Sequence, residues 1–161
     1  VMDKSSKLTI IMDSEEPEDL LIYCGNDLVD IFKDKVNSLL EHYLDQQFLQ
    51  IFVVSGVTED NQGRKGLKVL SRTTIGVGPL KEMWSLCARK IVDPVRSRVR
   101  KGAVAAVLLH NRLNGDATPD KSDIKIIKEL IADAGEWGKV LFDYIIVADN
   151  KYFSMREAGM L

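Results

Sequence analysis

The chain has 161 residues, of which 45% are hydrophobic and 29% are charged. That length suits one domain with a substantial core, and the balance excludes a chain that is disordered throughout. A formal net charge of −2 gives no general attraction to nucleic acid. No apolar run approaches the roughly 18 residues that a membrane helix needs, and no signal peptide is visible. We therefore expect a cytoplasmic globular protein without membrane association.

The first part of the chain contains one predicted strand and one predicted helix. The short apolar run of residues 7–12 is typical of an edge strand. From Asn26 to Tyr43, apolar residues recur at steps of three and four. This spacing predicts an amphipathic helix, with Asn26 as its N-cap.

The middle of the chain predicts a hairpin followed by helices. Residues 46–56 form a predicted buried strand, and residues 67–76 alternate well enough to be its returning partner. Pro79 suits the first position of the next helix, and a second short helix is predicted to end at Gly102.

The segment from residue 89 to residue 102 is locally basic, with many Lys and Arg against one Asp. One interpretation is a solvated helical face. The other is a patch that contacts the phosphates of DNA through Arg96, Arg98 and Arg100.

The last part of the chain alternates between strand and helix. Residues 103–110 form a nearly continuous apolar run, which predicts a central strand covered on both faces. Thr118 is the predicted N-cap of a helix, and Pro119 its first residue. Residues 140–148 and 151–155 are predicted to close the chain as two strands. The fold class is therefore α/β, of the α+β type, with a mixed sheet and flanking helices.

Several common chemistries have no support in the sequence. There is no glycine-rich dinucleotide fingerprint, no phosphate loop and no Gly-x-Ser-x-Gly elbow. Cys24 and Cys87 lie among apolar residues without CxxC spacing, which indicates reduced thiols in the core.

The stretch LLHNRLNGDATPDKSD, residues 108–123, carries the clearest chemical signal. A histidine at a strand end, followed by two aspartates on a helix, is a common beginning for a metal site. Arg112, however, stands two residues after His110, and a guanidinium has no lone pair to give to a metal. With one possible metal-ligand partner left, His110 is better interpreted as a hydrogen-bonded histidine at a strand end than as a metal ligand.

The run VLLHNRLNGDATPDKSDIKIIKEL and the tail VLFDYIIVADNKYFSMREAGML resemble the RadC proteins. These are a bacterial branch of the JAMM, or MPN, metalloprotease-like domains, whose pattern there is His-Asn-His-Pro-Ser-Gly-Asp-x-x-Pro-Ser-x-x-Asp. The resemblance covers residues 45–161 and is weakest from residue 77 to residue 102. It implies a sandwich of the MPN and cytidine-deaminase-like type for residues 45–161. Residues 1–44 would then be an extension, an edge strand and a helix, that packs on this domain.

The resemblance also implies a site. In such domains zinc is held by two His two residues apart and by an Asp on the following helix, while an upstream Glu is the general base. His110 matches the first His, Arg112 replaces the second, and Asp123 matches the Asp ligand. Asp120 takes the position of the Ser that stabilises the oxyanion, and Gln47 that of the base. Arg cannot ligate a metal and Gln cannot take a proton, which implies a degenerate motif without bound zinc.

Arg112 suggests a more specific hypothesis. Asp120 and Asp123 lie three residues apart on one helix face and would repel each other, and a guanidinium can pair with both. Arg112 would then take the electrostatic role of the lost cation. The alternative is that Arg112 points into solvent and that Asp120 simply favours the helix N-terminus.

Three functions follow as expectations. The first is a catalytically inactive RadC-like domain without a cofactor that binds an unknown protein or peptide, in the DNA-repair setting that the family name implies. The alternative is a metal-dependent, peptidase-like hydrolase with zinc in an altered site of His110, Asp120 and Asp123. The third is a DNA-binding module that uses residues 89–102. A homodimer is compatible with each of them.

Overall fold

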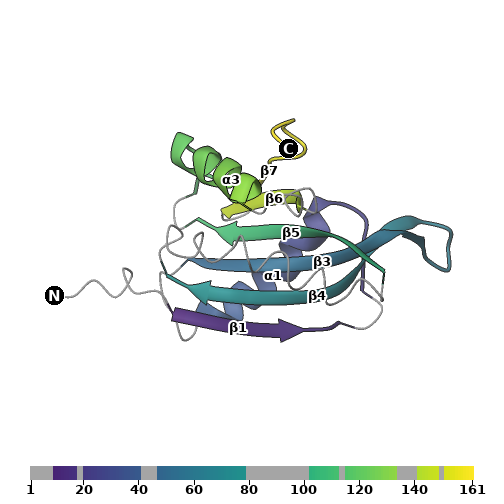
Figure 1. Ribbon diagram of the computed structural model, residues 1–161. Coiled ribbons are helices and arrows are strands. Elements are labelled where there is room, and N and C mark those ends of the chain that lie inside the picture. Colours follow the sequence, from purple (N-terminus) through teal and green to yellow (C-terminus); the bar gives the residue numbers. More distant parts are fainter. Residues whose placement is uncertain are drawn as a thin grey trace.

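The computed structural model describes residues 9–17, 20–40, 47–78, 102–112, 115–133, 141–148 and 151–161. In these ranges seven strands form one sheet, and two helices lie against it (Figure 1). The elements are β1 (Thr9–Glu15), β2 (Leu21–Ile22), α1 (Gly25–Leu40), β3 (Phe48–Glu59), β4 (Lys65–Val77), β5 (Ala103–Asn111), α3 (Lys121–Asp133), β6 (Leu141–Ala148) and β7 (Lys151–Ser154).

The sheet is mixed, with the strand order β1-β4-β3-β5-β6-β7, and β2 pairs with β4 beside β1. β5 and β6 are paired in parallel, whereas the other pairings among the described strands are antiparallel. Parallel neighbours need a crossover connection, and α3 lies within the one that joins β5 to β6. The predicted fold class, a mixed sheet with flanking helices, is confirmed.

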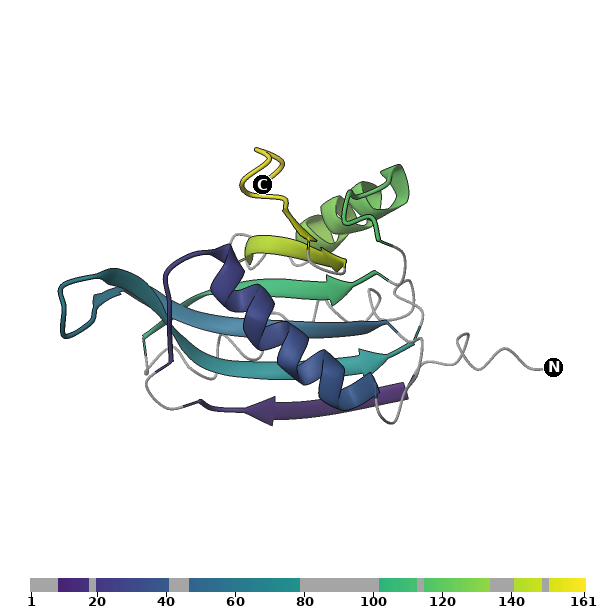
Figure 2. The ribbon, with the colours of Figure 1, turned by 180° about the vertical axis from the view of Figure 1, so that it is seen from behind.

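β5 is a central strand that is buried on both faces, as its apolar run predicts. Leu108 belongs to one hydrophobic cluster and Leu109 to the other, because successive side chains of a strand point to opposite faces. Ile127 of α3 packs in the first cluster, and Phe32 of α1 packs in the second. Figure 2 shows α1 lying across one face of the sheet.

The start of α1 differs from the prediction. The helix begins at Gly25, so Asn26 is a helical residue and the prediction that it caps the helix is wrong. Asp27 orders this end instead, because its Oδ2 accepts the N–H groups of Tyr23 and Cys24. Cys24 is a free thiol on the surface, so the prediction that it lies in the core is also wrong.

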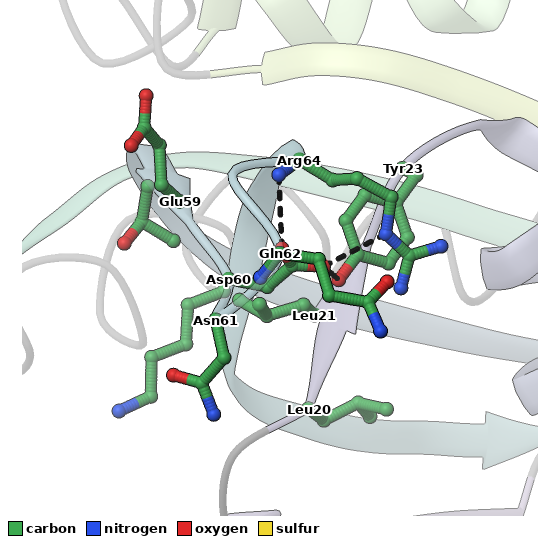
Figure 3. A pocket seen from close by; sticks show the side chains of 10 residues that line it. Leu20, Leu21, Tyr23, Glu59, Asp60, Asn61, Gln62 and Arg64 are labelled. Atoms are coloured by element: carbon green, nitrogen blue, oxygen red, sulfur yellow. Dashed lines mark hydrogen bonds and ion pairs between the residues drawn. The ribbon is translucent and has the colours of Figure 1, made fainter.

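The hairpin of β3 and β4 runs past the predicted strand ends and closes at a turn ordered by Asp60 (Figure 3). The Asp60 carboxylate accepts the Tyr23 hydroxyl, the N–H groups of Gln62 and Arg64, and the Arg64 Nε–H. The hydrogen bond from Tyr23 is the main reason that the pKa of Asp60 lies well below its usual range. Tyr23 therefore ties the start of α1 to the tip of the hairpin.

Some predictions fall outside the described ranges. These include the two helices between residues 79 and 102, the basic side chains Arg96, Arg98 and Arg100, and the domain boundary at residue 44. Of the helices that the structure describes, none combines the length and apolarity needed to cross a membrane.

A pair of strand glycines tests how tightly β2 packs on β4. A Cβ at Gly66 would come within 2.7 Å of the Ile22 carbonyl oxygen and 3.0 Å of the Tyr23 ring, whereas a Cβ at Gly56 would meet nothing within 4 Å. We expect Gly66→Ala to lower the free energy of unfolding by about 1–3 kcal/mol, because β2 must move. Gly56→Ala is the matched control, and equal urea midpoints for the two variants would contradict this packing.

Candidate functional site

The candidate site lies where the C-terminal end of β5 meets the N-terminal end of α3. His110 is paired with Leu49 of β3 and Ile146 of β6, so its backbone is fixed from both sides. The N–H of Arg112 donates to the carbonyl of Val147 at 2.8 Å, which holds the chain against β6 just beyond the end of β5. The side chains of His110 and Arg112 therefore extend from a backbone that is held in place by the neighbouring strands.

The first turn of α3 is closed by two carboxylates that hydrogen-bond to each other's backbone. Asp120 Oδ1 accepts the N–H of Asp123 at 2.8 Å, and Asp123 Oδ2 accepts the N–H of Asp120 at 3.0 Å. This reciprocal arrangement is a capping box, which makes Asp120 the N-cap. The prediction that Thr118 caps the helix and that Pro119 opens it is wrong, because the Thr118 N–H donates to Asp116 in a turn outside the helix.

The guanidinium of Arg112 lies against both capping carboxylates. Its Nη2 forms a close ion pair with Asp123 Oδ2, and its Nη1 lies 3.9 Å from Asp120 Oδ2. The side chains of Arg112 and Asp123 are 16% and 12% exposed, against 60% for Asp120. The inner pair is thus sheltered from water, whereas the outer one is exposed and weak.

His110 is fully buried and pairs with a buried tyrosine. A hydrogen bond joins its Nδ1 to the hydroxyl of Tyr144 in β6, and the two rings meet edge to face with centroids 5.2 Å apart. Burial lowers the pKa of His110 to about 3, and the charge of Arg112 lowers it in the same direction. The imidazole is therefore neutral at neutral pH.

Gln47 lies beside the same end of β5. Its Nε2 donates to the main-chain carbonyl of Asn111 at 3.3 Å, and Asn111 is the residue between His110 and Arg112. The Asn111 side chain in turn accepts the N–H of Phe48 at 2.6 Å. The structure therefore brings Gln47 next to the backbone between His110, in β5, and Arg112, just beyond it.

Sequence reasoning missed Tyr144 and Asn111. Tyr144 stands in an apolar strand with no motif around it, and the available signal was that a buried tyrosine needs a partner for its hydroxyl. Asn111 has no signal of its own in the sequence, because its role is a hydrogen bond to the backbone of another strand.

The residues present do not fit the zinc ion that the resemblance implies. A catalytic zinc site needs three protein ligands and an open position. Here Arg112 brings a positive charge and no lone pair, and it is already paired with Asp123. Within the described part of the chain, no group of three or more His, Cys, Asp or Glu side chains is placed to hold a metal.

Two cavities lie away from this site. A polar one of about 710 Å³ is lined by Tyr23, Asp60 and Arg64 at the β3–β4 hairpin (Figure 3). A mainly apolar one of about 720 Å³ lies between the start of α1 and β6, with Leu28 and Phe142 in its wall. None of the predicted site residues that the structure describes lines either cavity.

Comparison with known proteins identifies relatives of this chain. A family model described as "RadC-like JAB domain" matches residues 57–160, more than half of the chain. A UPF0758 protein of Desulforamulus reducens is 36% identical over 98 residues, which cover 58% of this chain and 40% of the relative. One of Listeria welshimeri is 30% identical over 156 residues, 95% of this chain and 59% of the relative. One of Desulfitobacterium hafniense is 32% identical over 123 residues, which cover 74% of this chain and 47% of the relative. The chain thus spans about half the length of the curated relatives it matches.

The buried imidazole predicts a pH dependence of stability. The pKa of His110 is about 3 in the folded protein and about 6.5 in the unfolded chain, so the unfolded state binds the proton first as the pH falls. Stability is therefore lost from pH 6.5 downward, by about 2 kcal/mol at pH 5. Because His110→Gln removes this titration, we expect its melting temperature to fall less than that of the native chain between pH 7.5 and 5. Parallel curves for the two proteins would rule this out.

Proposed function

The chain belongs to the RadC-like JAB domain family, and we propose that its site binds a protein or peptide partner without a metal ion and without hydrolysis. The observation that carries the proposal is the ion pair between Arg112 and Asp123. The resemblance assigns these positions to two zinc ligands, and here they neutralise each other.

The position assigned to the general base supports the same conclusion. Gln47 has an amide in place of a carboxylate, and its nitrogen donates a hydrogen bond to the Asn111 carbonyl. An amide cannot take a proton from an attacking water, which supports a site without hydrolysis. His110 does not replace that base, because it is buried and its Nδ1 is joined to Tyr144.

The partner is proposed to meet the site at its exposed rim. Asp120 is 60% exposed, whereas Arg112 and Asp123 are mostly buried, so Asp120 presents the accessible charge. A protein or peptide with a basic residue suits this rim. The resemblance to the RadC proteins supports a partner in a DNA-repair setting.

Metal analysis tests the first half of this proposal. We expect protein purified without chelator, then equilibrated with zinc and desalted, to hold well under one zinc per chain by plasma mass spectrometry. Arg112→His supplies the missing imidazole and is expected to bind about one zinc per chain, since His, His and Asp would then be present. Stoichiometric zinc in the native chain that disappears in His110→Ala would overturn the metal-free function.

A displayed random peptide library tests the second half. We expect the native domain to enrich peptides with basic residues. Asp120→Ser keeps an N-cap oxygen but removes the exposed charge, and is expected to weaken the selected peptides about tenfold, or 1.4 kcal/mol. Glu129→Gln, which removes an exposed charge farther along α3, is the matched control. No enrichment, or equal binding by both variants, would count against a binding role at this rim.

A further inference from the structure

We infer that Arg112 is a built-in cation that ties the end of β5 to the start of α3, at the place where the resemblance puts a metal ion. This inference goes beyond the proposed function, because it concerns what holds the two elements together rather than what the site binds. It rests on the capping box, on the two ion pairs of Arg112 and on the backbone anchor of that residue.

The sheltered carboxylate at the start of α3 benefits from a positive charge outside the helix. Asp120 and Asp123 both serve as cap acceptors, so both carboxylates are held close together by the backbone. The Asp123 side chain is only 12% exposed, so water screens its charge poorly. The helix N-terminus stabilises part of this negative charge, and a cation beside the sheltered carboxylate adds to that stabilisation.

Arg112 supplies this charge by position and by shape. Its N–H donates a hydrogen bond to the carbonyl of Val147 in β6, so the side chain starts from a fixed point beside the sheet. The planar guanidinium directs two nitrogens outward, and these lie against Asp123 and Asp120. One side chain therefore bridges sheet and helix, in the way that a metal bridges ligands from two elements. A lysine ammonium, as a point charge, would serve the inner carboxylate alone.

A double-mutant cycle tests the bridge. Asp123→Asn keeps a side-chain oxygen for the Asp120 N–H, so the cap survives while the charge is removed. We expect Arg112→Met to lower the melting temperature by about 5 °C, since breaking a sheltered pair leaves an uncompensated charge. Adding Asp123→Asn to Arg112→Met should cost nothing further, or recover part of the loss, because the repelling carboxylate is gone. Losses that simply add would overturn the inference.

The matched control is the ion pair of Lys125 and Glu129 on the same helix. Its atoms lie 4.0 Å apart and its side chains are 77% and 61% exposed. Lys125→Met, Glu129→Gln and their combination should shift the melting temperature by about 1 °C or less, with no coupling. Coupling as large here as at Arg112 would show a general charge effect and would overturn the bridge.

A third variant keeps the inference testable if Arg112→Met does not fold. Arg112→Lys should fold with an intermediate melting temperature, and Asp123→Asn should lower it less than it lowers the native protein. If Asp123→Asn lowers the melting temperature equally in the native protein and in Arg112→Lys, the two-nitrogen contact of the Arg112 guanidinium has no special role, which would overturn the inference. If the effects of Arg112→Met and Asp123→Asn on the melting temperature are not coupled, the bridge is contradicted but the proposed metal-free function is not. Stoichiometric zinc in the native chain would contradict that function. The two failures are therefore distinguishable.

Discussion

The burial of β5 on both faces is the constraint on which the other features depend. A strand whose Leu108 and Leu109 both leave water needs cover on both sides, which α1 and α3 provide. α3 lies in the crossover that returns the chain to β6 alongside β5, so its first turn comes back to the end of that strand. His110 lies inside this covered region near its end, which explains both the neutrality of its imidazole and its hydrogen bond with the Tyr144 hydroxyl.

At the end of β5 a guanidinium and a metal ion would compete for one carboxylate. In the family pattern the metal would take lone pairs from the Asp and two imidazoles, whereas here Arg112 forms an ion pair with Asp123 and the imidazole of His110 is joined to Tyr144. Both arrangements neutralise the same negative charge. They differ in chemistry, because only the metal polarises a bound water.

The sequence predicted the type of most described elements because the hydrophobic period is a property of each segment alone. It failed at the helix starts, where side-chain geometry decides. Asp27 and the pair Asp120 and Asp123 set those boundaries through bonds to particular N–H groups, which the residue pattern did not distinguish from a cap at Asn26 or Thr118. The short strand β2 escaped prediction because two residues carry no period.

The candidate site was predictable in its positions but not in its contacts. The spacing of the motif located His110, Arg112 and Asp123. It did not decide whether the Arg112 guanidinium points into solvent or pairs with the carboxylates. The choice depends on where α3 returns in space, which is a long-range property of the sheet. Tyr144 belongs to another strand altogether, so no local pattern could connect it with His110.

The capping box also bears on the order in which the site assembles during folding. Its two hydrogen bonds join residues three positions apart, so the acidic half can form as soon as the first turn of α3 nucleates. Arg112 reaches its place only when the chain beyond β5 docks on β6, a pairing that must close a long loop. We therefore expect the two carboxylates to meet early in folding and Arg112 to join them only when the parallel pair is complete.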